Sequence, residues 1–457
     1  MKTTKYQTLY EELKTMMLEG KFKPHEKLPS KRKLAYAAFV SVFTVQNAYD
    51  QLLMEGYIYT KEKIGYFVSE GVERTVKTTT PFETITQQSV SIPYHLSFKT
   101  NVVDNTLFPL SVWHKLSREV LSSSLFSLMN VTPAKGVLEL RVEIAKYLEI
   151  YRGMRVSPDQ IVVGSGTQPL LNLLVELLGR QHTYAIENPG YGRIHQTLTG
   201  LGVKTTAIEV DAYGLSLQAL LKSEAEIVHI TPAHQFPTGI IMPIQRRLAL
   251  LKWANEQKTR YIIEDDYDSE FRYTGAPVSS LFGLEINDQV IYMNSLSKSL
   301  GPAFKIGYVV LPKALLPLYE KIKNHHSCTV PNFEQYILYK FMHEGYFDRH
   351  LNKTRQIYKK KLEIIKSKIQ TKPYLEMMGD EAGLHFMLRI HTQVPEYALV
   401  EKLQSRGIEV RGLLDYYIHH IDLKPHVPTL VLGYSGIPLT EIESHISTLI
   451  DTIEALI

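Results

Sequence analysis

The sequence has little of three features that place proteins in specialised classes: cysteine, long apolar runs and net charge. Its single cysteine, Cys328, cannot form an internal disulfide and has no cluster of partners at metal-ligand spacing. No apolar run reaches the roughly 18 residues that a membrane span needs. The N-terminal stretch MKTTKYQTLYEELKTMM lacks the short apolar core of a secretory signal. We therefore expect a cytoplasmic protein with no membrane span, no disulfide and no metal site.

The net charge of +4 is too small over 457 residues to indicate a polyanionic partner by itself. A hydrophobic content of 44% and a charged content of 21% are typical of a globular protein rather than a disordered or fibrous one. The chain is longer than a single hydrophobic core usually allows, so two or more domains are expected. Evidence for a nucleic-acid partner must therefore come from local sequence patterns.

The first seventy residues have the pattern of short helices followed by a hairpin. In YQTLYEELKTMMLEG, apolar residues recur at helical spacing and stop at Gly20. Ser30 and Ser41 are placed as N-caps of two further helices, the second of which ends at Gly56. YIYTKEKIGYFV then alternates around a glycine-containing turn. This order predicts a winged helix-turn-helix, and the alternative is a small helical domain with no role in DNA binding.

The stretch from Leu28 to Val68 resembles the GntR-type winged-helix regulators. It carries their LPSxRxLA pattern, then TVxxAYxxLxxEGY, and a glycine in the wing. In that fold the second helix of the pair enters the major groove of double-stranded DNA with its N-terminal residues first. Cations and hydroxyls would contact phosphates, and an amide would read a base edge. The resemblance implies the DNA contacts Arg32, Ser41, Thr44, Gln46, Lys61 and Lys63.

Two positions depart from the GntR pattern. Phe39 stands where the family usually has glycine, and Val42 stands where it usually has arginine. Loss of a fork-shaped cation at the tip of the recognition helix removes a strong base or phosphate contact. The operator sequence therefore cannot be inherited from relatives.

After residue 70 the pattern changes twice. Residues 71–93 are rich in Thr, Ser and Gln without a sustained period, and we interpret them as a linker between domain 1–70 and domain 94–457. From residue 94 apolar strands alternate with amphipathic helices, which predicts an α/β domain with a largely parallel sheet. The segment FDRHLNKTRQIYKKKLEIIKSKI is expected to be a helix that bridges to a smaller C-terminal lobe.

In three motifs of this domain, an expected strand is followed by residues that could bind a ligand. VVGSGTQPLLNLL runs from a strand through small residues into a helix, whose N-terminus favours an anion. ENPGYGR offers Tyr191 for stacking on a ring and Arg193 as a nearby cation. IIEDDYDSEF delivers Asp265 and Tyr267 to the carboxyl end of a strand, where open α/β sheets bind ligands. A carboxylate there can hold a pyridinium nitrogen protonated.

The motif NSLSKSLGPAFKIGY surrounds Lys298 with serines and follows it with Lys305. A lysine amine with a lowered pKa forms a Schiff base with an aldehyde, and hydroxyls with a second cation suit an anion beside it. Pyridoxal phosphate combines an aldehyde and a phosphate in one molecule. The alternative interpretation is a polar loop between a strand and a helix.

The order and spacing of these motifs resemble the fold-type-I aminotransferases, and more closely the MocR-type regulators, which join that domain to a GntR-type winged helix. The resemblance implies that pyridoxal phosphate forms a Schiff base with Lys298. It also implies that Asp265 pairs with the pyridine nitrogen, Tyr267 bonds the ring hydroxyl and Tyr191 stacks on the ring. The implied phosphate ligands are Gly166, Thr167, Ser295, Ser297 and Lys305. Relatives usually have arginine at position 305, and lysine keeps the charge but loses the bidentate fork, so the cofactor would be held less tightly.

Two functions fit this organisation. A DNA-binding regulator that uses the aminotransferase-like domain as a sensor accounts for both ends of the chain, whereas a working aminotransferase with an appended domain is the alternative. A purely structural scaffold would not explain the lysine motif. The regulators that the chain resembles are head-to-tail homodimers, so a homodimer on two half-sites or direct repeats is implied.

The prediction of the effector depends on the lack of a second arginine that could bind the carboxylate of an amino acid. An amino-acid carboxylate is expected to be clamped by arginines, because the planar fork matches it with two hydrogen bonds. Arg193 is one candidate, but Asp415 precedes the tyrosine pair where the second arginine is expected, and Arg411 is the nearest substitute. We therefore expect pyridoxal phosphate itself to be the effector, with control of vitamin B6 synthesis or salvage genes and little turnover. The alternative is a sensor of amino acids or amines, as in GABA-type catabolism, that uses Arg193 and Arg411.

Overall fold

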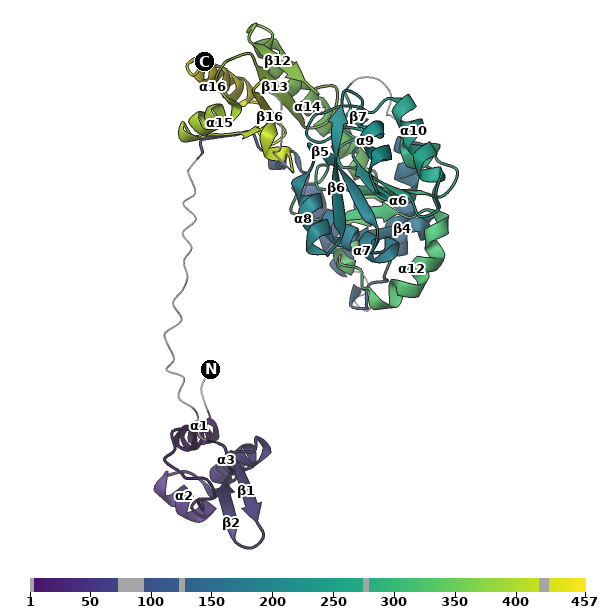
Figure 1. Ribbon diagram of the computed structural model, residues 1–457. Coiled ribbons are helices and arrows are strands. Elements are labelled where there is room, and N and C mark those ends of the chain that lie inside the picture. Colours follow the sequence, from purple (N-terminus) through teal and green to yellow (C-terminus); the bar gives the residue numbers. More distant parts are fainter. Residues whose placement is uncertain (1–3, 73–93, 123–127, 274–278, 419–426) are drawn as a thin grey trace. The chain divides into compact units, whose positions relative to one another are not determined.

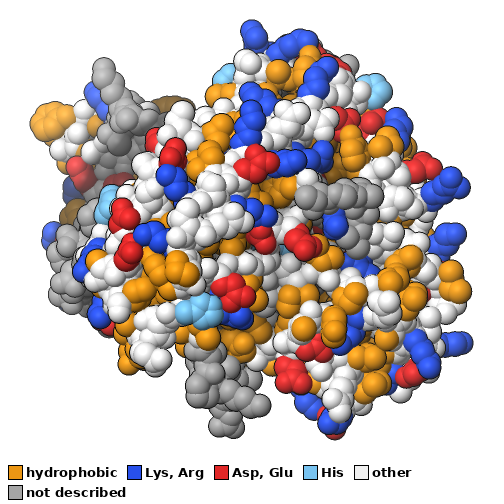
Figure 2. Space-filling view, turned by 90° about the horizontal axis from the view of Figure 1, so that it is seen from above, with side chains coloured by type: hydrophobic (Ala, Val, Ile, Leu, Met, Phe, Trp, Pro, Cys, Tyr) orange, Lys and Arg blue, Asp and Glu red, His pale blue; other side chains and the backbone are white. Residues whose placement is uncertain are grey.

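The computed structural model describes residues 4–72, 94–122, 128–273, 279–418 and 427–457. The chain divides into two compact units, Met1–Ser91 and Ile92–Ile457 (Figure 1). The expected linker lies outside the described residues from position 73 onward. Among the helices of the described ranges, none is both long and apolar enough to cross a membrane. Figure 2 shows acidic and basic side chains interspersed over the viewed face, in keeping with the small net charge.

The N-terminal unit is the predicted winged helix-turn-helix. Ser30 Oγ accepts a hydrogen bond from the Lys33 amide at 3.3 Å, and Ser41 Oγ accepts one from the Thr44 amide at 3.0 Å, so both serines cap helices as expected. The two strands pair antiparallel and form the wing. The elements are α1 (Lys5–Leu18), α2 (Lys31–Ala37), α3 (Val42–Met54), β1 (Ile58–Lys61) and β2 (Gly65–Val68).

Phe39, in the turn between α2 and α3, has a φ of 53° and a side chain that is 92% exposed. The Cβ atom of an L-amino acid makes this left-handed backbone conformation unfavourable by about 1–2 kcal/mol, whereas glycine adopts it freely. The greater freedom of glycine in the unfolded chain offsets part of that difference.

Phe39→Gly should therefore stabilise the N-terminal unit by up to about 1 kcal/mol. Slower amide hydrogen exchange in α2 and α3 of the full-length protein would measure this gain. Ala38→Gly is the matched control, because Ala38 has a φ of −92° and glycine should there accelerate exchange. Faster exchange in Phe39→Gly would show that the Phe39 side chain supports the fold.

An eight-stranded sheet forms the centre of the second unit, in the order β4-β11-β10-β9-β8-β5-β6-β7. Strands β11 and β7 run antiparallel to their neighbours and the other pairings are parallel, which confirms a largely parallel sheet. The strands are β4 (Ile161–Gly164), β5 (Thr183–Asn188), β6 (Lys204–Asp211), β7 (Gly214–Leu215), β8 (Ile227–Ile230), β9 (Tyr261–Asp266), β10 (Val290–Ser295) and β11 (Gly307–Val310).

Helices cover both faces of this sheet, so its central strands are apolar on both sides. Ile263 and Ile291 pack in one cluster with α7, α8 and α12, whereas the preceding residues Ile262 and Val290 pack in another with α9 and α10. The helices of the large domain are α4 (Leu110–Ser122), α6 (Leu138–Arg152), α7 (Thr167–Leu178), α8 (Gly192–Gly200), α9 (Leu217–Lys222), α10 (Ile244–Asn255), α11 (Leu281–Leu284), α12 (Leu316–Ile322) and α13 (Asn332–His343), with 3-10 turns η1 (Asn105–Leu107), η2 (Pro158–Gln160), η3 (Lys313–Leu315) and η4 (Lys323–His325).

The predicted bridging helix is α14 (Tyr346–Ile369), which contacts α13 of the large domain and β12 and α16 of the small lobe. The small lobe has a four-stranded antiparallel sheet in the order β12-β13-β16-β15. Strand β3 (Leu96–Ser97) pairs with β14 (Ile408–Glu409). The remaining elements are β12 (Leu375–Met378), β13 (His385–Ile390), β15 (Arg411–Gly412), β16 (Thr429–Gly433), α15 (Glu396–Ser405), α16 (Ile442–Glu454) and η5 (Leu413–Tyr416).

Candidate functional site

The register of the central sheet places the predicted ligand-binding loops together at the carboxyl ends of its parallel strands. Gly164, the last residue of β4, pairs with Gly307, which pairs in turn with Ser295 at the end of β10. In the next strand Asp265 pairs with Met293. Because β4, β5, β8, β9 and β10 run in the same direction, their carboxyl ends form a single edge at which ligands bind in open α/β sheets.

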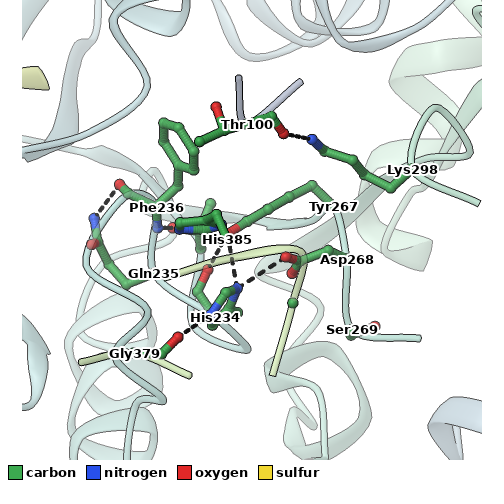
Figure 3. A network of polar contacts seen from close by, with 12 residues as sticks. Thr100, His234, Gln235, Phe236, Tyr267, Asp268, Ser269, Lys298, Gly379 and His385 are labelled. Atoms are coloured by element: carbon green, nitrogen blue, oxygen red, sulfur yellow. Dashed lines mark hydrogen bonds and ion pairs between the residues drawn. The ribbon is translucent and has the colours of Figure 1, made fainter. Parts of the chain in front are cut away.

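Lys298 is a half-buried amine that follows the end of β10. Its Nζ donates a hydrogen bond to the carbonyl of Thr100 (Figure 3). Burial lowers the pKa of Lys298 to about 8, although the carboxylates of Asp268 and Glu270 act in the opposite direction. An appreciable fraction of the amine is therefore uncharged, and thus nucleophilic, near neutral pH.

This pKa predicts the pH profile of the reaction between Lys298 and an aldehyde. Only the neutral amine attacks, so the initial labelling rate by pyridoxal phosphate, trapped with borohydride, should rise about tenfold per pH unit below pH 8. It should level off above pH 8, whereas an ordinary lysine with a pKa of about 10.4 keeps gaining reactivity to pH 10. Peptide mass spectrometry after trapping measures both classes of lysine in one sample. A Lys298 profile that matches the ordinary lysines would contradict the lowered pKa.

Asp265 has one oxygen that is paired and one that is not. Its Oδ2 lies 3.3 Å from His229 Nε2, and both residues are buried. Its Oδ1 is also buried and accepts no hydrogen bond from the described part of the chain. A buried, unpaired carboxylate oxygen is costly, and a protonated ring nitrogen is a group that would satisfy it. This feature fits a pyridine ring at the strand edge.

Glu187 is a second buried carboxyl group, and it lies near His229. Burial raises the pKa of Glu187 to about 7, while hydrogen bonds from Thr231 and the nearby His229 act to lower it. Thr231 donates to Glu187 Oε2 from its hydroxyl at 2.6 Å and from its amide at 3.1 Å. Neither Glu187 nor His229 was predicted, because only their tertiary contacts connect them to Asp265.

The expected phosphate ligands lie at the N-terminus of α7 and on the loop after β10. Gly166 caps α7 with a φ of 91°, and a Cβ built on it would meet nothing within 4 Å. The hydroxyls of Ser295 and Ser297 are hydrogen-bonded to each other at 2.8 Å. Thr167, the first residue of α7, is half-buried, and Lys305 is exposed with a φ of 45°. Open space beside the backbone amides of a helix N-terminus, with serine hydroxyls nearby that can donate hydrogen bonds, suits a phosphate group.

Aromatic side chains line the same edge. Tyr191, at the start of α8, meets the ring of Phe236 edge-on at 5.7 Å. Phe236 in turn meets Tyr416 at 5.3 Å and lies perpendicular to Tyr267 at 6.0 Å. Phe236 and Tyr416 were not predicted, although the motif TPAHQFPTG that contains Phe236 stands out in the sequence.

Tyr267 belongs to a buried polar network (Figure 3). Its hydroxyl donates to the His234 carbonyl at 2.9 Å and lies 3.1 Å from His234 Nδ1. The same nitrogen lies 3.0 Å from Asp268 Oδ2. Burial acts to lower the pKa of His234, but Asp268 outweighs it and the net shift is upward. Because the Tyr267 hydroxyl already donates to the His234 carbonyl, its hydrogen bond to a cofactor hydroxyl stays a prediction.

His385 brings the small lobe into this network. It lies at the start of β13, and its ring is 4.9 Å from that of His234. Its Nε2 lies 3.0 Å from the Pro237 carbonyl, and burial, His234 and Lys298 hold its pKa well below the ordinary value. His234, Asp268 and His385 are close enough to hold a metal ion, but one nitrogen of each imidazole already lies against a backbone carbonyl, that of Gly379 for His234 and that of Pro237 for His385. Their arrangement fixes the two lobes against each other beside Lys298.

The two candidate arginines flank the aromatic residues. Arg193 is exposed on α8 and forms a hydrogen bond that acts to lower the pKa of Tyr191. Arg411 is exposed on β15 and acts in the same direction on Tyr416, although burial raises both tyrosine pKa values overall. Asp415 Oδ2 accepts from the Gly412 amide at 3.3 Å, so this carboxylate caps the turn η5.

The predicted DNA-contacting cations are accessible. Arg32, Lys61 and Lys63 are exposed. Ser41 and Thr44 share a hydrogen bond between their hydroxyls at 2.8 Å at the first turn of α3.

Gln46 is engaged within the N-terminal unit. Its Oε1 accepts from Lys31 Nζ, and its Nε2 donates to Asp50 Oδ1 at 2.5 Å. The amide must leave these partners before it can read a base edge. Lys31 was not predicted to lie here, because the contact joins two different helices.

Comparisons with known proteins match both units. Residues 5–68 match the model for bacterial regulatory proteins of the gntR family, and residues 96–416 match that for aminotransferase class I and II. YdeL, an uncharacterised HTH-type transcriptional regulator of Bacillus subtilis, is 35% identical over 97% of this chain and 96% of its own length. PdxR, an HTH-type pyridoxine biosynthesis transcriptional regulator of Corynebacterium glutamicum, is 30% identical over 90% of this chain and 88% of its own length. An archaeal alanine:glyoxylate aminotransferase structure is 27% identical, with a TM-score of 0.71 over 79% of this chain and 91% of that chain.

Proposed function

The chain belongs to the MocR-type subfamily of GntR transcriptional regulators, in which a winged helix-turn-helix is fused to an aminotransferase class I and II domain, and we propose that its binding to DNA responds to pyridoxal phosphate. The observation that carries this proposal is the unpaired, buried Asp265 Oδ1 near the end of β9, beside the end of β10 that leads to the half-buried amine of Lys298. Bound pyridoxal phosphate supplies an aldehyde and an electron-accepting ring. The protein is proposed to act in the cytoplasm, where its DNA target lies.

Each residue of the site has a role in holding this cofactor. Lys298 provides the amine that bonds to the aldehyde, and Asp265 holds the ring nitrogen protonated with support from His229. Tyr267 orients the ring through its hydroxyl, and Tyr191 stacks on it. The residues proposed to bind the phosphate are Gly166, Thr167, Ser295, Ser297 and Lys305.

Asp415 is the residue that favours the cofactor as effector. An aspartate at this turn repels the carboxylate of an amino acid, and its bond to Gly412 fixes it in place. The relative PdxR is named for pyridoxine biosynthesis, which supports control of vitamin B6 synthesis or salvage genes. We infer little or no aminotransferase turnover from the same reasoning.

A sensor of amino acids or amines is the second candidate, because Arg193 and Arg411 flank the same aromatic residues. To separate the two, the cofactor-loaded protein is titrated with amino acids and amines while its absorption spectrum and its DNA affinity are recorded. The cofactor-sensor proposal expects no ligand that changes both at millimolar concentration or below. A ligand that does so in the wild type, but not in an Arg193→Ala, Arg411→Ala variant, would establish the second candidate. Product formation from an amino donor and a keto acid, measured in parallel, would identify an active enzyme.

A homodimer is proposed because apolar side chains cluster on the surface of the large domain. Met129, Val131, Leu138 and Phe333 are exposed. Their segments adjoin, since Asn332 Nδ2 donates to the Asn130 carbonyl at 2.7 Å and the Val137 amide donates to Gln335 Oε1 at 2.9 Å. An exposed apolar cluster of this kind marks an interface. A head-to-tail dimer would cover it and present two winged helices to repeated half-sites.

A further inference from the structure

The turn of the helix-turn-helix carries an exposed apolar cluster, here called the apolar tip. It consists of Tyr36, Phe39, Val42 and Phe43, whose side chains are 86%, 92%, 47% and 73% exposed. The core of the unit is formed by other residues, such as Ala35 on α2 and Val45 and Tyr49 on α3. Large apolar side chains gathered at one exposed site indicate a surface that binds a partner.

The surroundings of the apolar tip favour a polyanion as the partner. Lys31, Arg32 and Lys33 precede it on α2, and the exposed Lys61 and Lys63 lie on the wing of the same unit. These cations would repel a second copy of the same surface, but they suit the phosphates of a DNA duplex. Val42 and Phe43 are also the first two residues of α3, the part of a recognition helix that enters the major groove first.

The apolar tip restricts what can be read in that groove. Phe43 lies on the same face of α3 as Gln46 and Asp50, whose side chains are already hydrogen-bonded to each other. Valine and phenylalanine side chains offer no hydrogen-bonding group to a base edge. The C5 methyl group of thymine is the one apolar group that the major groove presents. We propose that Val42 and Phe43 contact thymine methyl groups, so that the operator half-sites are specified by thymine rather than by a guanine–arginine pair.

This inference rests on DNA binding by the winged helix, and the test distinguishes a failure of methyl recognition from a failure of DNA binding. Full-length protein is used to select duplexes from a random-sequence pool, and a selected duplex is synthesised again with deoxyuridine in place of every thymine. Uracil keeps each hydrogen-bonding group of thymine and lacks only the methyl. Each contacted methyl should contribute roughly threefold to tenfold in affinity, so the uracil duplex should bind the wild type at least about tenfold more weakly.

Substitutions in the apolar tip identify the residues that read the methyl groups. Phe43→Ala and Val42→Ala should weaken binding to the thymine duplex and reduce the difference between the thymine and uracil duplexes. Lys61→Ala is the matched control, because loss of a phosphate contact should weaken both duplexes equally and leave their ratio unchanged. Retained binding of each variant to the uracil duplex shows that the unit is folded.

Three outcomes would overturn the inference. Equal wild-type affinity for the thymine and uracil duplexes would exclude methyl recognition while leaving DNA binding intact. A thymine preference that persists in the Phe43→Ala, Val42→Ala double variant would assign it to other residues. A change of oligomeric state in Phe43→Ala with an unchanged thymine preference would make the apolar tip a protein interface. Failure to select any duplex would instead contradict DNA binding itself.

Discussion

Lys298→Ala is expected to abolish the near-visible absorption band that purified protein shows with pyridoxal phosphate. The band arises from the bond between the cofactor aldehyde and a lysine amine, and burial lowers the pKa of Lys298 to about 8. It also follows the end of β10, which neighbours the ends of the strands that carry Asp265 and lead into α7. Without that amine the loss should be complete rather than partial.

Lys305→Ala is the matched control, since it removes a lysine from the same motif without removing the proposed bond. It should keep the band but raise the pyridoxal phosphate concentration for half-saturation by about tenfold or more, the effect of one lost charge-assisted hydrogen bond. A band that persists in Lys298→Ala, with borohydride reduction fixing the cofactor on another lysine, would refute the assignment.

The second large effect is expected in the salt dependence of DNA binding. If Arg32 and Lys61 each neutralise a phosphate, their double alanine variant should make the negative slope of log affinity against log salt shallower by about two units. Affinity should fall for all DNA sequences alike, because phosphate contacts carry no base information. Gln46→Ala should instead reduce discrimination between sequences with a smaller loss of non-specific binding.

Fluorescence anisotropy across a salt series measures both quantities. Lys252→Ala on α10 is a control that removes a positive charge from the other unit and should leave the slope unchanged. A wild-type slope in the Arg32→Ala, Lys61→Ala variant would remove these two residues from the interface with DNA.

Local features of this chain were predictable from sequence because each depends on a few adjacent residues. Ser30 and Ser41 cap helices, as expected, because a short polar side chain before an apolar helical period satisfies free amides. The alternation of strands and helices predicted the sheet, but not the antiparallel direction of β11, since a buried strand is apolar whichever way it runs.

Contacts between distant segments were not predictable. The pairing of His229 with Asp265 joins neighbouring strands, and His385 reaches His234 from the other lobe. The bond from Lys31 to Gln46 joins two helices of the N-terminal unit. No periodicity marks these pairs, because they arise from strand register and lobe packing. The site residues themselves lie in short motifs that can be recognised along the sequence, and the experiments above test their roles.

The most direct test of the account measures the affinity of the wild type and Lys298→Ala for a selected operator duplex while pyridoxal phosphate is titrated. We expect the wild-type affinity to change by at least about fivefold, the lower range of coupling between two sites, with a midpoint that coincides with appearance of the absorption band. Lys298→Ala should bind the duplex with an affinity that the cofactor does not change. A wild-type affinity that is the same with and without saturating pyridoxal phosphate would contradict the claim that the cofactor is the signal.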